Sequence, residues 1–331
     1  MVKLPVIPTD LTLAASDAVL VQRSRKDKFY GKSIGMGAIG DECSRKLWYA
    51  FRLASGIQDN FDAGTLKVFE DGHYQEDLQA KRLRMVDGIT LITEEPSTGK
   101  QIKHLAANGH LKGFQDGDIL GLLEAPNTWH VWEHKAVGEK KWAKLRDLKM
   151  ADEKSALERW DATYYAQAVL YMYLSGHKRH YLTCSTPGGR QSISVRTNAN
   201  TEKAKALIRR AENIINSDKA PARPFPEDYY ACNWCGFKTQ CHEGRFSHRN
   251  CRTCLHSTPI EDGQWHCAKH DDIIETDFQA TGCPDQRFLP DLIPGKQIDV
   301  VDGDILYAMD EGYNWLDQGA IPSNPESGEA E

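Results

Sequence analysis

Helical and strand-like patterns alternate along residues 41–217, and this alternation limits the possible fold more than any other feature of the chain. Apolar residues recur at near-helical spacing over 41–55 and again over 61–86. Short apolar runs then indicate four strands: Ile89–Thr93, Ile102–Ala106, Asp118–Leu123 and Trp129–Lys135. Further helices are expected at 139–150, 155–175 and 201–217, with strands at 179–185 and 191–196. This order predicts an α/β fold with a mixed sheet.

The composition of the chain is that of a globular protein. Its 331 residues are 40% hydrophobic and 27% charged, which is enough to build one large domain or two ordinary ones. No apolar run approaches the roughly 18 residues that a membrane helix needs. Asp10 and Asp17 interrupt the first thirty residues, which therefore resemble neither a signal peptide nor a transit peptide. We expect a cytoplasmic protein with no membrane partner.

Charge is distributed unevenly along the chain. The net charge is −6, but nine acidic residues follow Lys296 and no Lys or Arg does. Residues 1–296 therefore hold 41 basic and 38 acidic side chains, a net charge of +3. The overall charge does not exclude a polyanionic partner such as DNA.

The first chemical signal lies on a pair of strands between Gly113 and Val137. Asp116 is placed at a strand start, and Glu133 and Lys135 are two residues apart on the next strand. Side chains alternate along a strand, so Glu133 and Lys135 point to the same face. Charges on an apolar strand are costly to bury unless they are used. Two carboxylates can hold a hard cation such as Mg²⁺, and a nearby ammonium can orient water.

Three other groups of residues support a site here. His73 and Glu76 lie on the preceding helix, and Gln167 and Tyr171 lie at i and i+4 on a later one. Five basic residues between them suit phosphate contact: Lys140, Lys141, Lys144, Arg146 and Lys149. Alone, each group has an ordinary explanation, such as a satisfied helix histidine, residues packing on the sheet or a solvated helix face.

The order G-H, G-x-x-D-G, E-x-K and Q-x-x-x-Y, between about Gly40 and Cys241, resembles the RecB-like branch of the PD-(D/E)xK nuclease superfamily. The resemblance implies a restriction-endonuclease-like mixed sheet flanked by helices. It further implies that His73, Asp116 and Glu133 bind Mg²⁺ or Mn²⁺, that Lys135 positions the attacking water, and that Gln167 and Tyr171 organise the site and the DNA. Asp118 is a rival for Asp116, which we favour because it occupies the D-G position.

Nine cysteines in a reducing compartment are not expected to form disulfides. Cys184 lies in an apolar strand-like stretch and is expected to be a buried free thiol. The iron–sulfur subset of RecB-like nucleases, including CRISPR-associated and AddB-type exonucleases, has one cysteine before the nuclease core and three after it. That resemblance implies a [4Fe–4S] cluster held by Cys43, Cys232, Cys235 and Cys241. Such a staple would be worth roughly 5 kcal/mol of loop-closure entropy.

The remaining four cysteines follow as a compact set: Cys251, Cys254, Cys267 and Cys283. The two-residue spacing of the first pair suits a tetrahedral zinc site, in which His270 could replace one thiolate. A rival partition, in which the pairs 232/235 and 251/254 form a zinc ribbon, also has acceptable spacing. The family resemblance, rather than the spacing, favours the first partition.

These features predict four parts: a basic N-terminal segment (1–35), a nuclease domain (36–245), a zinc-binding module (246–290) and an acidic tail (291–331). The expected function is a metal-dependent DNA exonuclease acting on ends or single strands, in recombination, repair or phage replication. The alternative is a non-catalytic DNA-binding or recombination partner that uses the same scaffold. Tyr171 and Trp142 could stack on an unpaired base or pack in the core. Within the tail, Ser323–Glu331 is expected to be disordered, whereas Ile298–Leu316 could compete with DNA or bind a protein.

Overall fold

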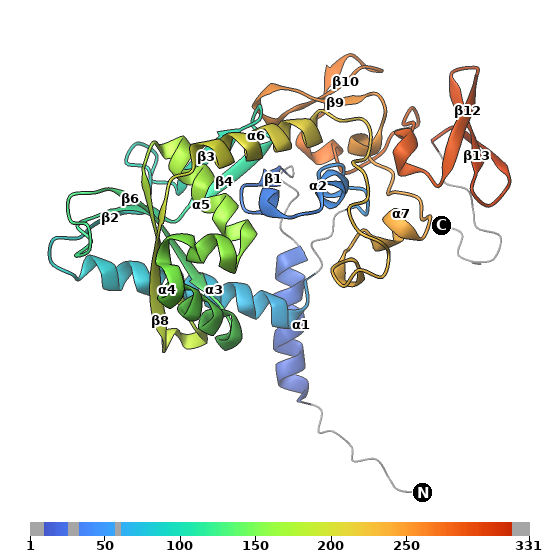
Figure 1. The fold of residues 1–331 in the computed structure, drawn as a ribbon. Helices are drawn as coiled ribbons and strands as arrows, with labels where there is room; N and C mark the ends of the chain where they lie inside the picture. The colour runs from blue at the N-terminus through green and yellow to red at the C-terminus, as the bar shows by residue number, and fades with distance from the viewer. Residues whose placement is uncertain (1–9, 26–32, 57–60, 320–331) are drawn as a thin grey trace, which may run out of the picture.

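The computed structural model describes residues 10–25, 33–56 and 61–319. Its largest sheet is mixed, has five strands and lies in the left part of the view in Figure 1. The strand order is β2-β5-β6-β7-β8, in which β6 and β7 run parallel and the other neighbours are antiparallel. The strands are β2 (Thr90–Ile92), β5 (Gly117–Leu120), β6 (His130–Ala136), β7 (Arg179–Ser185) and β8 (Ser192–Asn198).

The described residues also form three smaller sheets, of three strands each. The first has the strand order β1-β4-β3. Its strand β4 is followed directly in the chain by β5 of the five-stranded sheet. The second belongs to the cysteine-rich segment and the third to the C-terminal segment. The strands are β1 (Ile34–Gly35), β3 (Ile102–Ala106), β4 (Leu111–Gln115), β9 (Ser257–Pro259), β10 (Trp265–Cys267), β11 (Asp272–Ile273), β12 (Gly295–Val301), β13 (Asp304–Met309) and β14 (Asn314–Asp317).

Helices flank the sheets, with α3 packed against β6 and α4 against β8. The α-helices are α1 (Leu11–Arg25), α2 (Ser44–Phe51), α3 (Ala63–Arg84), α4 (Glu139–Trp160), α5 (Ala162–Ser175), α6 (Thr201–Ile215) and α7 (Lys238–His242). Short 3₁₀ turns are η1 (Ala38–Gly40), η2 (Pro187–Gly189), η3 (Cys232–Trp234), η4 (Cys251–Thr253), η5 (Glu261–Gly263), η6 (Thr276–Phe278) and η7 (Pro290–Leu292).

The main core is built around α5, half of whose residues are buried, and this helix packs against α6 and η1. A close approach at Gly40 makes this packing possible. A Cβ at that position would lie 2.5 Å from the backbone oxygen of Ala162, so only glycine fits between η1 and α5. The core continues into the cysteine-rich segment, because Trp265 and Phe288 belong to the same apolar cluster.

The predicted fold class is confirmed: the chain is mixed α/β, with helices flanking a mixed sheet and a cysteine-rich region after it. The predicted start of the helix over 155–175 is wrong, because α4 continues to Trp160 and α5 begins at Ala162. Asp161 then caps α5, its carboxylate accepting the backbone N–H groups of Thr163 (2.9 Å) and Tyr164 (3.1 Å). The expected break near residue 152 is a kink at Asp152 within α4.

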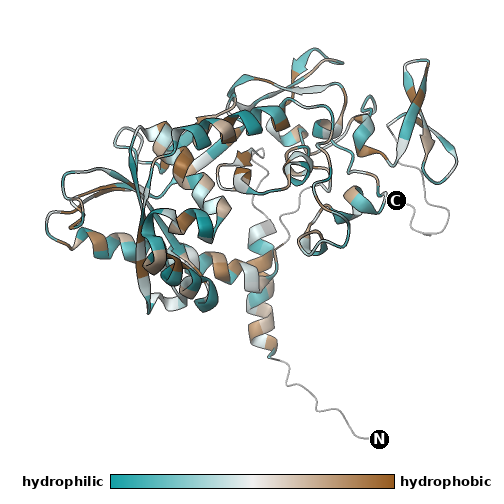
Figure 2. Ribbon diagram, in the orientation of Figure 1, coloured by the Kyte–Doolittle hydropathy of each residue, from teal (hydrophilic) through white to brown (hydrophobic). Residues whose placement is uncertain are grey.

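The two ends of the described chain contain structure that the sequence pattern did not predict. Helix α1 projects from the body with apolar residues in view (Figure 2), and Leu11 and Leu13 are 74% and 63% exposed. The segment 298–316 forms most of an antiparallel sheet, in which Tyr307 is buried and stacks with Trp315. Two predicted features lie partly or wholly outside the described residues: the basic N-terminal segment, with Lys26, Lys28 and Lys32, and the tail segment Ser323–Glu331. No helix within the described ranges is long and apolar enough to cross a bilayer.

Candidate functional site

A cavity of about 830 Å³ lies between α3 and β6, the middle strand of the five-stranded sheet. Six of the polar residues that line it were singled out from the sequence and come from four separate segments: His73 and Glu76 of α3, Asp116 between β4 and β5, Glu133 and Lys135 of β6, and Gln167 of α5. The structure therefore brings together residues up to 94 positions apart in the sequence. Tyr171 and Asp118 do not line this cavity.

Glu133 is the most enclosed carboxylate of the cavity, at 3% exposed. Its Oε1 accepts hydrogen bonds from Lys135 Nζ at 2.6 Å and from Gln167 Nε2 at 2.7 Å. Its Oε2 is buried and has no hydrogen-bond partner among the described residues. A buried carboxylate oxygen without a partner is costly, so this atom is suited to bind a cation.

Asp116 lies beside Glu133 because β5 pairs with β6, with Gly117 opposite Trp132. Its Oδ2 accepts the backbone N–H of His134 at 2.8 Å and lies 3.9 Å from Lys135 Nζ. The ammonium of Lys135 is thus shared by two buried carboxylates, and it also lies 5.6 Å from the ring centroid of Tyr164. Of the two aspartates considered from the sequence, Asp116 lies in the cavity and Asp118 does not. Asp118 Oδ1 is 2.9 Å from His177 Nε2 instead.

Electrostatics in the cavity favour an added positive charge. Burial, and then repulsion from Asp116, raise the pKa of Glu133 to about 8 despite Lys135. The same two causes raise the pKa of Glu76 to about 7, and burial raises the pKa of Asp116. Burial would lower the pKa of Lys135, but the charges of Glu133 and Asp116 outweigh it and raise that pKa above its ordinary value. Three acids with one shared ammonium are the environment that a divalent cation stabilises.

Glu76 is a functional candidate that the motif reading left without a role. It stands three residues after His73 on α3, so the two share a helix face. The charge of His73 lowers the pKa of Asp116 and so opposes the effect of burial, which indicates that His73 lies near that carboxylate. The helical i, i+3 spacing was the signal that could have identified Glu76.

A chain of hydrogen bonds connects Glu133 to the neighbouring sheet. Gln167 Nε2 also donates to Tyr171 Oη at 3.1 Å, and Tyr171 Oη donates to the backbone oxygen of Phe114 at 2.8 Å. Tyr171 is 1% exposed, so packing in the core is the one of its two alternatives that the structure shows. Trp142 is likewise half-buried against the core and donates to the backbone oxygen of Cys184 at 3.3 Å.

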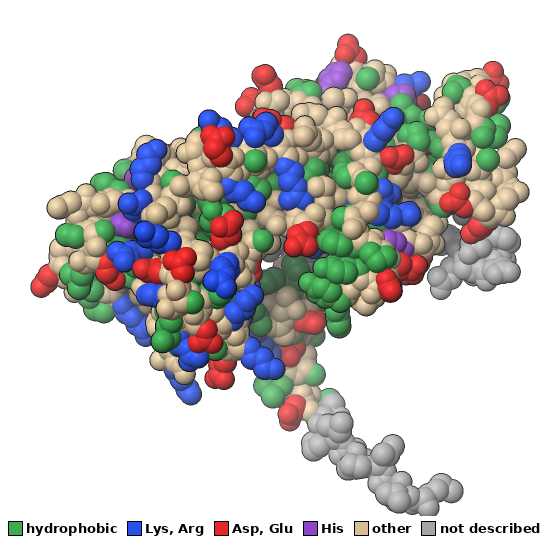
Figure 3. Space-filling model, viewed as in Figure 1, with side chains coloured by type: hydrophobic (Ala, Val, Ile, Leu, Met, Phe, Trp, Pro, Cys, Tyr) green, Lys and Arg blue, Asp and Glu red, His purple; other side chains and the backbone are tan. Residues whose placement is uncertain are grey.

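The basic residues of α4 are mostly engaged within the protein. Lys141 Nζ is 2.6 Å from Asp161 Oδ2, and Lys149 Nζ is 3.7 Å from Glu153 Oε1. Lys144 and Arg146 have partners as well. Figure 3 shows Lys and Arg side chains interspersed with acids over this part of the molecule. Their arrangement is that of a solvated helix face, which is the ordinary explanation given for them in the sequence analysis.

The first set of cysteines converges, although Cys43 is 189 residues from Cys232. All four thiols line one small cavity beside the stacked rings of Tyr49 and Phe237. Cys43 caps α2, its sulfur accepting the backbone N–H of Lys46 at 3.3 Å. Burial raises the pKa of the Cys43 and Cys232 thiols, so a bound metal would be needed to hold them as thiolates.

In the second set, Cys254, Cys267 and Cys283 lie close enough to Cys251 for their charges to act on it. Burial, followed by the charges of Cys283, Cys254 and Cys267, raises the pKa of Cys251 to about 11. Within the described residues, the group whose ligand atoms all lie within 4.8 Å of one another is His270, Cys283 and Asp285. His270 Nε2 is 3.9 Å from Cys283 Sγ. The rival pairing of 232/235 with 251/254 finds no support, because Cys232 and Cys235 line a cavity with Cys43 and Cys241. Cys184 is fully buried, and burial raises its pKa to about 12.

Comparison with known proteins gives a distant likeness to solved structures. No protein-family model matches the chain, and no curated protein matches it either. SSO0001 is 15% identical with a TM-score of 0.38, over 70% of this chain and 96% of that one. The alkaline exonuclease LHK-Exo from Laribacter hongkongensis is 12% identical with a TM-score of 0.35, over 60% and 90% of the two chains. The structure of LHK-Exo in complex with dAMP is 13% identical with a TM-score of 0.35, over 55% of this chain and 85% of that one. At these values the likeness establishes neither family nor activity for this chain.

Proposed function

We propose that this protein is a metal-dependent nuclease that hydrolyses phosphodiester bonds of DNA, most simply as an exonuclease on ends or single strands. One observation carries the proposal: the buried carboxylate of Glu133 lies beside Asp116 in the 830 Å³ cavity. One of its oxygens contacts Lys135, and the other has no partner among the residues that the structure describes. Acid, acid and ammonium around one cavity are the groups that metal-assisted phosphoryl hydrolysis requires.

The residues fit Mg²⁺ or Mn²⁺, because hard cations prefer carboxylate oxygens. Asp116 and Glu133 would hold the ion, with Glu76 and His73 completing its surroundings from α3. When bound, such an ion supplies charge that polarises a phosphate oxygen and lowers the pKa of water. Lys135 would orient the water and stabilise negative charge that develops on the phosphate. Gln167 would hold Glu133 in place, and Tyr171 would hold Gln167.

We also propose that the two sets of cysteines hold structural metals. Cys43, Cys232, Cys235 and Cys241 would hold a [4Fe–4S] cluster, for which four thiolates are the usual ligands. Cys251, Cys254, Cys267 and Cys283 would hold zinc, with His270 as a possible replacement ligand near Cys283. Neither centre contributes a group to the cavity of Glu133 among the described residues.

The decisive experiment combines metal-dependent cleavage with a variant of Lys135. End-labelled single strands and plasmid are incubated with Mg²⁺, Mn²⁺ or EDTA. We expect cleavage with either metal and none with EDTA. Lys135→Ala should lower turnover by at least a hundredfold, because the water loses its orienting cation. Lys140→Ala is the matched control, since Lys140 is exposed on α4 and does not line the cavity.

Folding and metal content are measured in parallel for both variants. Unchanged turnover in well-folded Lys135→Ala would remove the catalytic assignment. DNA binding by the wild type without cleavage under any metal would instead favour the non-catalytic scaffold. A role in recombination, repair or phage replication is a further proposal, for which the substrate preferences of the purified protein are the first test.

A further inference from the structure

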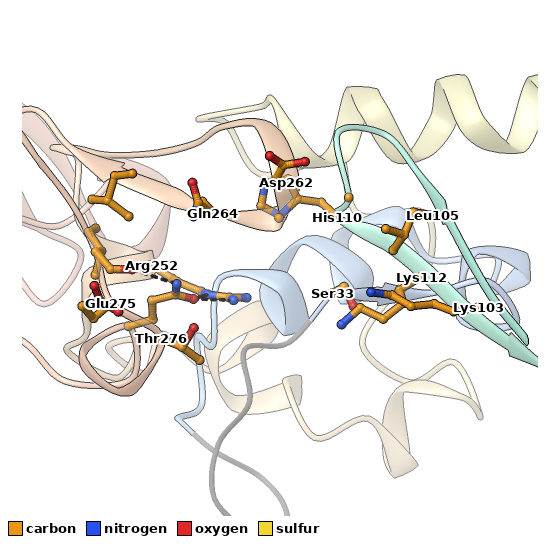
Figure 4. Close-up of a pocket in the computed structure, with 15 residues that line it drawn as sticks. Ser33, Lys103, Leu105, His110, Lys112, Arg252, Asp262, Gln264, Glu275 and Thr276 are labelled. Atoms are coloured by element: carbon orange, nitrogen blue, oxygen red, sulfur yellow. Dashed lines mark hydrogen bonds between the residues drawn. The ribbon is translucent and has the colours of Figure 1, made fainter. Parts of the chain in front are cut away.

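A second cavity, of about 330 Å³, lies between the β3–β4 hairpin and the cysteine-rich segment (Figure 4). Lys103, Lys112 and Ser33 stand on one wall, and Arg252, Glu275 and Thr276 stand on the other. Its volume is at the lower end of the roughly 300–1,000 Å³ that is usual for ligand sites. None of the residues that line it belongs to the cavity of Glu133.

The outer face of the hairpin has an unusual composition. Cross-strand pairing places Lys103 opposite Phe114 and Leu105 opposite Lys112, so all four side chains share one face. Phe114 and Leu105 are 47% and 46% exposed, although they lie in the middle of regular strands. Cations alternating with exposed apolar groups on a sheet are suited to a strand of nucleic acid, whose phosphates and bases alternate in the same way.

The two lysines lack the carboxylate partners that Lys141 and Lys149 of α4 have. Neither Lys103 nor Lys112 forms an ion pair with any described residue. Lys112 is also partly buried, and burial and then the charge of Lys103 lower its pKa. The carboxylates of the cavity, Asp262 and Glu275, are exposed on the cysteine-rich side. An anion lying along the hairpin would relieve the repulsion between the lysines.

Strand β4 connects this face to the first cavity. Lys112 precedes Asp116 by four residues of extended chain, a distance of about 13 Å. Gln101, just before β3, lines the cavity of Glu133, while Lys103 lines the second cavity. A single strand whose scissile phosphate lies at Asp116 can therefore reach the two lysines within a few nucleotides.

We propose that the β3–β4 face is a secondary binding site for the phosphate backbone of single-stranded nucleic acid, in which Lys103 and Lys112 contact phosphates and Phe114 and Leu105 contact bases. This inference rests on the proposed nuclease function, because the path of the strand is drawn from Asp116. The cysteine-rich segment then has a role as the far wall of the binding site.

Binding of labelled oligonucleotides of increasing length tests the site. The protein carries Glu133→Gln to prevent cleavage, and Lys103→Ala/Lys112→Ala is compared with Lys203→Ala/Lys205→Ala, whose lysines are exposed on α6. For a 12-mer we expect about tenfold weaker binding in the hairpin variant and a salt slope smaller by about 1.4. For a dinucleotide we expect no difference, because it does not reach the hairpin. Lys103→Arg/Lys112→Arg should restore 12-mer binding.

Three outcomes would overturn the proposal. The first is equal binding of the 12-mer by the hairpin variant and the α6 control. The second is displacement of the 12-mer by polyglutamate as efficiently as by unlabelled DNA, which would indicate an acidic peptide as the occupant. The third is AMP binding as tightly as the 12-mer, which would indicate a mononucleotide site. Failure of the nuclease proposal is seen separately, as absent Mn²⁺-dependent hydrolysis of a p-nitrophenyl nucleotide ester by the wild type.

Discussion

At the scale of single residues, Glu133 decides the chemistry of the molecule. The carboxylate is enclosed on the middle strand of the sheet. One of its oxygens contacts the ammonium of Lys135, and the other has no hydrogen-bond partner within the described ranges. Burial, then repulsion from Asp116 and to a smaller extent from Glu76, raise the pKa of Glu133, and the charge and hydrogen bond of Lys135 oppose them. The protein without a bound divalent ion therefore contains an acid that is destabilised in its charged form.

This destabilisation predicts a dependence of stability on pH. The folded-state pKa of Glu133 is about 8, above its ordinary value near 4.3, so the folded state binds the proton more tightly. Stability from this group is present at low pH and is lost as the pH rises towards 8. Between pH 6 and 8, without Mg²⁺, we expect the wild type to lose on the order of 1–2 kcal/mol of unfolding free energy relative to Glu133→Gln.

Urea unfolding of both proteins at pH 6, 7 and 8 measures this difference. The comparison is needed because buried His134 and His180, whose pKa values are lowered mainly by burial, make both proteins more stable as the pH rises above 6. Saturating Mg²⁺ should abolish the relative loss, because a bound cation stabilises the carboxylate. Parallel pH profiles for the two proteins would contradict the argument.

At the scale of elements, β4 and α5 determine where Glu133 is held. A Cβ at Gly113 would lie 2.6 Å from the ring and the hydroxyl of Tyr171, so the absence of a side chain there lets the helix approach the strand. Tyr171 in turn contacts Gln167, which contacts Glu133. The glycine of the G-x-x-D-G pattern thus acts three contacts away from the carboxylate.

We expect Gly113→Ala to displace Tyr171, to cost about 1–3 kcal/mol of stability and to lower cleavage by at least tenfold. Gly138→Ala is the control, since a Cβ at Gly138 would meet nothing within 4 Å. Chemical denaturation and the steady-state cleavage rate are measured for both. If Gly113→Ala cleaved DNA at the wild-type rate, the relay through Tyr171 would have no role in positioning.

At the scale of the whole molecule, the cysteine-rich segment is part of the core and contacts α2 through two buried arginines. Arg252 donates to the backbone oxygen of Phe51 at 3.0 Å, and Arg52 Nη1 lies 3.3 Å from the backbone oxygen of Arg252. Both guanidinium groups lie within 5.3 Å of the ring of Trp265. Together with the thiols that gather around Cys43, these contacts join α2 to segments that follow it by about 200 residues.

Loss of the first thiol cluster should therefore affect the whole fold. We expect Cys43→Ser to lose iron and up to about 5 kcal/mol of stability, the loop-closure value for a loop of this length. Cys184→Ala should keep its iron, because Cys184 lies in the core away from both clusters. Iron and sulfide analysis of anaerobically purified protein, followed by denaturation, measures both effects. Full iron content in Cys43→Ser would exclude this residue as a ligand.

The sequence by itself determined the α/β class and the alternation of elements. It also indicated five of the polar residues that line the first cavity: His73, Asp116, Glu133, Lys135 and Gln167. These depend on local periodicity and on the cost of placing charge on an apolar strand, both of which can be read along the chain. Helix ends were less certain because a single cap, the carboxylate of Asp161, decides where α5 begins.

Only the tertiary structure decided which of Asp116 and Asp118 faces Glu133, that Tyr171 is buried, and that Glu76 joins the cavity. It also decided that Ile298–Leu316 contributes to a sheet and that the β3–β4 face meets the cysteine-rich segment. The physical reason is common to all of these features. Each depends on pairing and packing between segments far apart in the chain, and no local pattern encodes which distant residue a side chain will meet.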